Sequence, residues 1–259
     1  MKKKLAALLA SGMILFSGIS FAADLTDEGY VEAEGFGEAG QPDGPGRRSA
    51  VMDAYRYLAE QVDDLHISSS TTVRQSRTVN DEINSNIESI IHGAKVISVS
   101  KEKDGSFRAL VRLSAYGSPE SLVAAVLPKN KETVDFPKPK YTNTESSASS
   151  GVRYTGVIID CRGLGLETAV SPAIMTSGGE KIYDYANLDY QNVLDHGMVA
   201  YSHKMDSGVE RAGIQPLVVK AVSVHASCDP VISQEDADKI LVSNQAGGFL
   251  KQCSVVFVR

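Results

Sequence analysis

The sequence predicts an α+β protein built of two small domains, and three observations support this prediction. The chain opens with a basic head and a long uncharged run, and a polar, proline-bearing stretch divides the remainder near its middle. Strand-like and helix-like patterns occur on both sides of that stretch. We expect helices packed on one face of a mainly antiparallel sheet in the first domain, and a mixed sheet in the second.

The first twenty-two residues have the layout of a secretory signal peptide. Lys2, Lys3 and Lys4 form a basic head, residues 5–19 carry no charge, and small residues precede a cut after Ala22. The uncharged run is shorter than the roughly twenty residues of a membrane-spanning helix, although a retained anchor is the alternative. No cysteine lies at the cut, so we expect no lipid anchor there and no transmembrane segment after cleavage.

The charge of the chain argues against nucleic acid as a partner. The formal net charge is −6, and it becomes −9 once the three signal-peptide lysines are removed. Binding to phosphate backbones needs clustered Lys and Arg, and Arg47-Arg48 is only a pair. We therefore expect an exported protein of the periplasm or cell envelope, either soluble or peripherally attached.

A linker is predicted at residues 129–151. Its first part contains Pro137 and Pro139 among alternating charges, and its second part is rich in Thr, Ser and Asn. Such a stretch buries too little apolar surface to offset its ordering entropy, so we expect it to be flexible. The predicted divisions are a signal peptide at 1–22, domains at 29–128 and 152–259, and this linker between them.

The first domain is expected to begin with a strand at residues 30–36, where polar and apolar residues alternate. A Gly- and Pro-rich loop at 37–46 leads to a helix at 47–64. Small side chains on this helix predict close approach of the helix to the sheet. They belong to an apolar stripe at every fourth position, formed by Ala50, Ala54, Leu58 and Val62.

The rest of the first domain follows from local signals. Residues 68–78 are rich in Ser, Thr and Val and are expected to be extended. Asn80 can cap a second helix that stops at Gly93. The remaining elements are a hairpin of strands 95–101 and 107–113 around Lys103-Asp104-Gly105, and a last helix that Ser118-Pro119 opens.

The second domain is expected to open with a buried strand at 154–160, because β-branched residues run through it. A helix is expected at 205–212 with Gly213 as its stop, and Ser233 begins another that continues through 237–241. The further expected strands lie at 172–175, 181–183, 198–201, 217–224 and 254–258.

The segment from Asp160 to Gly165, which we call the candidate interaction loop, is the most site-like part of the sequence. Asp160 ends a strand, Arg162 begins a tight turn, and Gly163 and Gly165 would let a backbone or ligand approach closely. The plainer interpretation is that Asp160 and Arg162 pair with each other and the glycines satisfy the turn. We favour this plainer interpretation for the local structure.

Catalytic chemistry finds no support in the sequence. The loop lacks the third glycine and the long following helix of a dinucleotide site. Cys161 beside a β-branched strand favours a buried, inert thiol. The histidines are scattered, and His196 and His203 lack the close spacing of metal ligands. We therefore expect no enzyme and no catalytic, cofactor-binding or metal-binding residue.

The chain contains three cysteines. A secreted domain of this size can build a core without disulfides. An odd number leaves at least one thiol unpaired within the chain. The sequence leaves open a Cys228–Cys253 bridge, a Cys161–Cys253 bridge, or three buried thiols.

Several segments resemble known families. Residues 46–62 are similar to the first helix of the twenty-kilodalton outer-membrane lipoprotein family and to the N-terminal domain of flagellar assembly protein T. Residues 93–97 and 104–111 resemble the strand pair that follows there. Residues 154–164 and 213–221, with Pro172, look like a companion domain of related secreted proteins.

The resemblance implies a bacterial envelope protein that supports outer-membrane or flagellar assembly. We expect it to act without catalysis, through contacts with envelope proteins at the sheet edge of the first domain and at the candidate interaction loop. This chain lacks the lipid-bearing cysteine of the lipoprotein members, so their lipid attachment is not carried over. The alternative is a small-ligand-binding or hydrolytic protein that uses Asp160 and Arg162.

Overall fold

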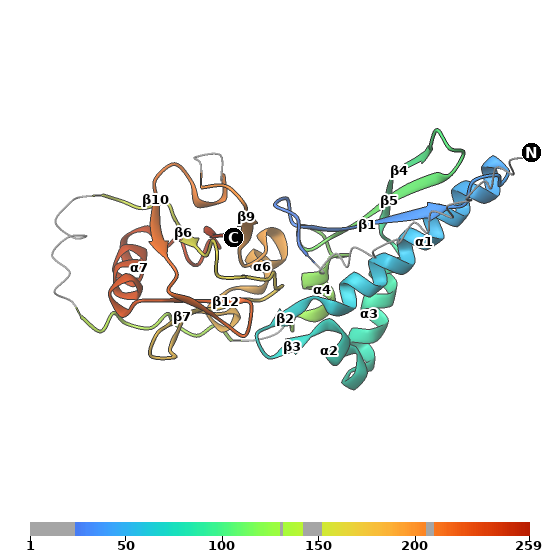
Figure 1. The fold of residues 1–259 in the computed structure, drawn as a ribbon. Helices are drawn as coiled ribbons and strands as arrows, with labels where there is room; N and C mark the ends of the chain where they lie inside the picture. The colour runs from blue at the N-terminus through green and yellow to red at the C-terminus, as the bar shows by residue number, and fades with distance from the viewer. Residues whose placement is uncertain (1–23, 130–131, 142–151, 206–209) are drawn as a thin grey trace, which may run out of the picture.

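The computed structural model describes residues 24–129, 132–141, 152–205 and 210–259, so the predicted signal peptide lies outside it. The described chain forms an α+β structure of two halves placed side by side (Figure 1). An antiparallel sheet with helices makes up the N-terminal half, and two further sheets make up the C-terminal half. The predicted fold class is confirmed.

In the N-terminal half one long helix lies across one face of a three-stranded sheet, and three shorter helices complete the described part of this half. The sheet has the order β1-β5-β4, and both pairs of strands are antiparallel. The long helix α1 packs its fully buried stripe of Ala50, Ala54, Leu58 and Val62 against β1 and β5, as the four-residue spacing predicts. The elements are β1 (Tyr30–Gly37), α1 (Asp43–Asp64), β2 (His66–Ser68), β3 (Thr71–Thr72), α2 (Val73–Val79), α3 (Asp81–His92), β4 (Lys95–Lys101), β5 (Phe107–Ser114) and α4 (Leu122–Val126).

Glycine makes the close approach between α1 and the sheet possible. A Cβ on Gly35 of β1 would overlap the backbone of α1 at Ala50 and Ala54. In the first turn of α1, the ring of Phe107 packs on Gly46 and fills the space that a Cβ at this position would occupy. The helix therefore starts at Asp43, earlier than predicted, because this turn packs against β5 despite its glycines.

The prediction that residues 68–78 are extended was wrong for their second part, which forms α2. Thr72 and Gln75 make a reciprocal capping box that starts this helix. Packing against α3 then favours a helix over the extended conformation that Thr and Val prefer. Asn80 caps α3 through Glu82 N and Ile83 N, as predicted.

The C-terminal half contains a parallel sheet of order β10-β6-β13-β9 and a mixed sheet of order β11-β12-β7-β8. The central strands β6 and β13 are almost entirely buried, as their β-branched runs predict. The elements are β6 (Gly156–Asp160), β7 (Ile174–Thr176), β8 (Lys181–Tyr183), η1 (Tyr185–Asn187), α6 (Tyr190–His196), β9 (Ala200–Ser202), η2 (Glu210–Ala212), β10 (Pro216–Lys220), β11 (Ser223–His225), β12 (Asp229–Ile232), α7 (Gln234–Gly247) and β13 (Val255–Val258).

Two predictions in this half needed correction, and one helix was missed. The strand expected at 217–224 is divided between β10 and β11, which belong to different sheets. No sequence pattern indicated α6, a short helix that buries only Val193 and is capped by Asp189. The helix expected at 205–212 is a 3-10 turn where described, and its residues 206–209 lie outside the described part.

The hairpin between β11 and β12 carries backbone strain. Ala226 and Ser227 both have positive φ, 43° and 65°, in the turn that the hydrogen bond from Cys228 N to His225 O closes. Residues with a Cβ adopt this left-handed conformation at a cost of roughly 1–2 kcal/mol, and Asn-Gly is the favoured pair in such turns.

We predict that Ala226→Asn combined with Ser227→Gly raises the free energy of unfolding by about 1 kcal/mol, because the strain is relieved. Urea denaturation monitored by circular dichroism measures this change. Ser177→Gly is the control, since Ser177 itself does not have a positive φ and glycine there only adds chain entropy. A double variant no more stable than the parent would contradict the assignment of strain.

The described first part of the predicted linker, residues 132–141, is held along the C-terminal half. Val134 N donates to Ala186 O at 2.8 Å, and the ring of Phe136 stacks on Tyr183. The buried carboxylate of Asp238 accepts from Lys140 N at 2.8 Å and from Tyr141 N at 3.1 Å. The expectation of flexibility was wrong for this part, which we call the strap, because its backbone groups find partners. The predicted linker residues 142–151 lie outside the described part, and the predicted domain limits stay a prediction.

The two halves pack directly on each other. Val170 N and Ser171 N donate to the carbonyl oxygens of His66 and Ile67, at 2.9 and 2.7 Å. One continuous cluster of buried apolar side chains extends from α1 through α4 into the C-terminal sheets. The described halves are therefore joined by a shared core as well as by the strap.

Candidate functional site

The candidate interaction loop follows β6 at the carboxyl edge of the parallel sheet. Asp160 accepts a two-pronged bond from Arg162, whose Nε and a terminal guanidinium nitrogen each lie 2.8 Å from one carboxylate oxygen. Gly163 and Gly165 take the positive φ values that this turn requires, 77° and 70°. The structure thus brings the four predicted residues together in the self-satisfied arrangement of the plainer interpretation.

The electrostatics of the loop follow from this pair. The hydrogen bonds from Arg162 lower the pKa of Asp160, and those same bonds raise the pKa of Arg162. A carboxyl group whose pKa is lower in the folded state stabilises the fold at pH values above its unfolded-state pKa. This stability is lost as the pH falls through the folded-state pKa. Arg162 is half exposed, so solvent screening keeps this contribution small.

An apolar surface adjoins the loop. The edge strand β10 lies beside β6 with Lys220 opposite Asp160, and Ala221 N donates to Asp160 O. Val218 on β10 and Val222 after it are 53% and 58% exposed, Ile214 before it is 99% exposed, and Leu164 of the loop itself is 36% exposed. We call these four residues the β10 edge. Sequence patterns missed it, because an edge strand and a central strand share the same residue preferences.

The three cysteines are free and fully buried, which resolves the alternatives left open by the sequence in favour of buried thiols. Burial raises the pKa values of Cys161 and Cys228 to about 12, and it also raises the pKa of Cys253. A thiol in this state is protonated at neutral pH and therefore a poor nucleophile.

We predict that the native protein does not react with an alkylating thiol reagent at pH 8, because the thiols are buried and protonated. After denaturation without a reductant, all three thiols should react. Mass spectrometry counts the added groups, and the denatured, reduced protein serves as the control. Fewer than three modified thiols in the denatured, unreduced protein would demonstrate a disulfide.

Two histidine–carboxylate pairs lie at the contact between the halves. His66 Nε2 is 3.1 Å from Glu167 Oε2, and His203 Nδ1 is 3.1 Å from Asp27 Oδ1. His196 lies elsewhere, at the end of α6. Within the described ranges no three His, Cys, Asp or Glu side chains are grouped as metal ligands would be.

The segment at Asp24 and Leu25 is bound to the C-terminal half, which the sequence did not predict. Leu25 N donates to Thr168 Oγ1 at 3.0 Å, and that hydroxyl lies 3.1 Å from Asp24 Oδ1. The carboxylate of Asp24 also pairs with Arg259 in the last residue of the chain. Because residues far apart in the sequence make these contacts, no local sequence pattern predicts them.

Two shallow hollows each contain an arginine, and they differ in whether a carboxylate pairs with that arginine. In the first, Arg77 pairs with Asp63 at 2.5 Å and donates to Asn84 Oδ1 at 2.8 Å. In the second, Arg211 donates to the carbonyl oxygens of Cys253 and Gly197 and forms no ion pair with any described residue. Neither hollow is lined by the candidate interaction loop.

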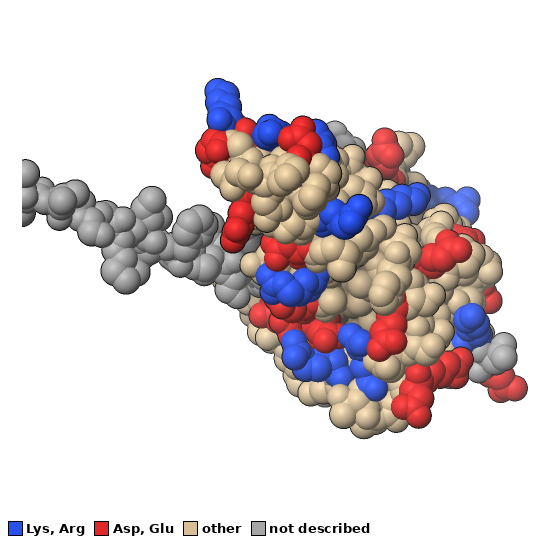
Figure 2. Space-filling model, turned by 90° about the vertical axis from the view of Figure 1, so that its right-hand side faces the viewer, with Lys and Arg blue, Asp and Glu red and all other residues tan. Residues whose placement is uncertain are grey.

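Surface charge is mixed on the face that the N-terminal half presents. In Figure 2, Lys and Arg side chains are interspersed with Asp and Glu over this face. On the sheet of this half, Arg112 pairs with Glu32 and Arg108 pairs with Glu34. The face lacks the single-signed basic area that phosphate-backbone binding requires.

Comparison with known families gives two matches, one in each half. Residues 24–114 match the family described as LPP20 lipoprotein. Residues 156–259 match the family described as Treponema pallidum Tp0624, second domain. No curated protein matches the chain. The predicted similarity to the lipoprotein family is confirmed for residues 24–114, whereas the resemblance to flagellar assembly protein T stays a prediction.

Helix length and polarity decide whether a helix can insert into a lipid bilayer. Among the helices of the described ranges, none combines the length and the apolar character needed to cross a membrane.

Proposed function

We propose that this chain is an exported protein of the bacterial cell envelope that acts by binding other envelope proteins and performs no catalysis. The lipoprotein-family match over residues 24–114 supports a place in the envelope. The signal-peptide layout of residues 1–22 supports export. The finer assignments, to the outer membrane or to flagellar assembly, belong to this proposal as two candidate settings.

The observation that carries the binding role is the β10 edge beside the candidate interaction loop. Four exposed apolar residues lie on or around β10: Val218 on the strand itself, Ile214 before it, Val222 after it, and Leu164 in the loop that follows β6. In a parallel sheet, every second residue of a strand directs its backbone N–H and C=O toward the same neighbouring strand, and the residues between them direct these groups to the other side. Gln215 O and Ala221 N are bonded toward β6, so Val218 and Lys220 direct their backbone groups outward. An extended partner segment could pair with these groups.

The sheet edge of the N-terminal half is a second candidate contact surface. The edge strand β4 leaves Val96 and Ile97 43% and 46% exposed. An irregularity in its pairing with β5 and a lysine at each end protect it against indiscriminate pairing. We therefore place the main contact at the β10 edge.

Site-specific photocrosslinking in intact cells tests the binding role. A photoreactive residue at Val218 should capture an envelope protein that is absent when the same residue replaces Val79, which is 85% exposed in the other half. No product at Val218 under any growth condition would count against the β10 edge as the contact surface.

Fractionation with mass measurement tests export separately. The proposal expects an unlipidated chain that begins at Ala23 and is recovered from the envelope fractions. An intact chain in the cytoplasm would overturn it. Deletion with a swimming assay decides the flagellar setting, because a strain that swims normally excludes a required flagellar role.

The alternative of a ligand-binding or hydrolytic loop finds little support in the geometry. Arg162 is engaged by Asp160 through both prongs. The neighbouring thiol of Cys161 is buried and has a raised pKa. The charge of Arg162 is therefore neutralised by Asp160, and the thiol of Cys161 is not presented for nucleophilic attack.

A further inference from the structure

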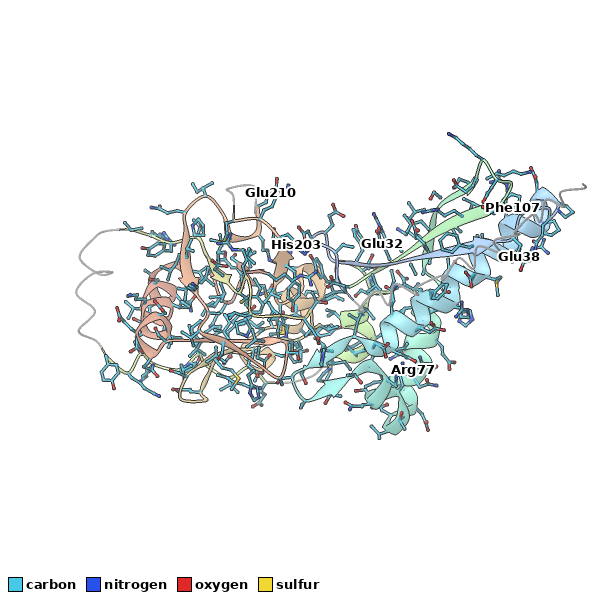
Figure 3. The ribbon with its side chains drawn as sticks, in the orientation of Figure 1. Glu32, Glu38, Arg77, Phe107, His203 and Glu210 are labelled. Atoms are coloured by element: carbon cyan, nitrogen blue, oxygen red, sulfur yellow. The ribbon has the colours of Figure 1, made fainter. Side chains whose placement is uncertain are left out.

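The shallow hollow around Arg211 is large enough to hold a small ligand. Its volume is about 390 Å³, within the range of small-molecule pockets of roughly 300–1,000 Å³. Figure 3 shows Glu210, at its rim, along the upper side of the C-terminal half. We call it the Arg211 hollow, and its lining residues are Asn192, His196, Glu210, Arg211, Gln252 and Ser254.

The guanidinium of Arg211 is fixed in place. Its Nε donates to Cys253 O and one terminal nitrogen donates to Gly197 O, both at 2.6 Å. The guanidinium carbon lies 5.9 Å from the ring centroid of Tyr116. A side chain held from three directions loses little conformational entropy when it binds a ligand, so its binding geometry is formed in advance.

The positive charge of Arg211 is not neutralised by its described neighbours. The hydrogen bonds from its Nε and its terminal nitrogen go to neutral carbonyl groups, and within the described residues it has no carboxylate partner. An arginine carries five N–H donors, so donors remain for an anionic oxygen. In the other hollow the comparable arginine, Arg77, is already paired with Asp63.

Three of the other lining residues, Glu210, Gln252 and Ser254, favour a singly charged anion. Gln252 and Ser254 provide a neutral amide and a hydroxyl, which can donate to a carboxylate. Glu210 adds one negative charge at the rim and would repel a doubly charged phosphate more strongly than a carboxylate.

The lining residues all belong to the C-terminal half, and the N-terminal half supports Arg211 from behind through Tyr116. Tyr116 follows β5 of the N-terminal half, and its ring occupies the space that a Cβ on Gly197 would need. Gly117 N donates to Leu194 O of α6 at 2.7 Å. The contact between the halves therefore sets the position of the ring against which Arg211 is held.

We propose that the Arg211 hollow binds a singly charged carboxylate, presented by a small organic acid or by the C-terminus of a peptide. This inference is independent of the β10 edge. Arg211 would bind the carboxylate through its remaining N–H groups, with Gln252 and Ser254 as additional donors.

Binding to the full mature chain can be measured by titration calorimetry or by NMR of the arginine side chains. The probes are acetate, N-acetyl-dialanine, the C-terminal amide of that peptide, and inorganic phosphate. We expect a carboxylate to bind with a Kd on the order of 1 mM and the amide to bind at least ~10-fold more weakly. If acetate binds as tightly as N-acetyl-dialanine, the natural ligand is a small organic acid. If N-acetyl-dialanine binds more tightly than acetate, the natural ligand is the C-terminus of a peptide.

Variants assign the binding to this hollow. Arg211→Lys should weaken binding about tenfold, because lysine lacks the planar fork. Arg47→Lys is the matched control, since Arg47 likewise donates to a carbonyl, Val99 O, in the other half. Glu210→Gln should tighten binding about threefold by removing a like charge. If Arg211→Lys does not fold, the exposed Gln252→Ala should still weaken binding about threefold.

Four results would overturn the proposal. The first is no carboxylate binding up to ~10 mM, and the second is equal binding of the peptide and its amide. The third is tighter binding of phosphate than of carboxylate. Folded Arg211 and Gln252 variants that bind like the parent protein would place any observed binding elsewhere and likewise reject the site.

Discussion

Gly35→Ala is expected to lower the free energy of unfolding by about 3 kcal/mol or more. Gly35 lies in the second half of β1, where a Cβ would meet the backbone nitrogen of Ala54 and the carbonyl oxygen of Ala50 in α1. Backbone atoms of a hydrogen-bonded helix cannot rotate away as a flexible side chain can. The whole helix would have to move off the sheet, and this movement would open the core around Leu58.

Urea denaturation followed by circular dichroism measures the loss, and recovery of soluble protein serves as a coarser measure. Gly44→Ala is the matched control, because Gly44 lies in the first turn of the same helix and a Cβ added there would have no atom within 4 Å. There alanine should be neutral or slightly stabilising. Equal stability of Gly35→Ala and the parent protein would show that α1 is not held as close to β1 as described.

Asp238→Ala is expected to cost about 3 kcal/mol and to release the strap. The Asp238 side chain is 1% exposed, and its oxygens accept from Lys140 N, Tyr141 N and Gln234 Nε2. Removing the carboxylate leaves these three N–H donors without their acceptor at the same time. Hydrogen bonds to a charged acceptor contribute more than neutral ones, so Asp238 anchors the backbone at the end of the strap, where the exposed Lys140 Nζ also pairs with Glu180 at 2.7 Å.

Denaturation gives the energy, and limited trypsin digestion reports on the strap through cleavage after Lys138 or Lys140. Cleavage there should be faster in Asp238→Ala than in the parent protein. Glu235→Ala is the control on the same helix, because Glu235 forms only an exposed pair with Lys239 and should change stability by less than ~0.5 kcal/mol. Unchanged cleavage in Asp238→Ala would mean that other contacts suffice to hold the strap.

Local patterns predicted much of the fold correctly. The stripe from Ala50 to Val62 identified α1 and its buried face, and the Lys103–Gly105 turn identified the hairpin of β4 and β5. These elements are specified by residues close in sequence, through helix periodicity and turn conformation. The failures at α2 and α6 are short helices whose apolar periodicity is too brief to register, and whose caps and tertiary contacts decide the conformation.

The candidate site shows a sharper division. The sequence located the loop at Asp160 and Arg162 and anticipated that the two would pair. No pattern indicated Arg211, because the groups that fix its guanidinium come from Gly197, Cys253 and Tyr116. Nor could the sequence show that the loop adjoins an exposed edge strand, since the same Val-rich pattern suits a buried strand as well.

The sequence by itself determined the α+β class, the principal strands and helices, the buried character of Cys161 and the similarity to envelope lipoproteins. Only the tertiary structure decided that the halves share one core, that the strap is held by Asp238, and that Arg211 keeps a charge that no described carboxylate neutralises. The reason is the separation along the sequence over which each kind of interaction acts. Periodicity, caps and turns act over a few residues, whereas cores and charge pairing depend on residues that the fold brings together from distant positions.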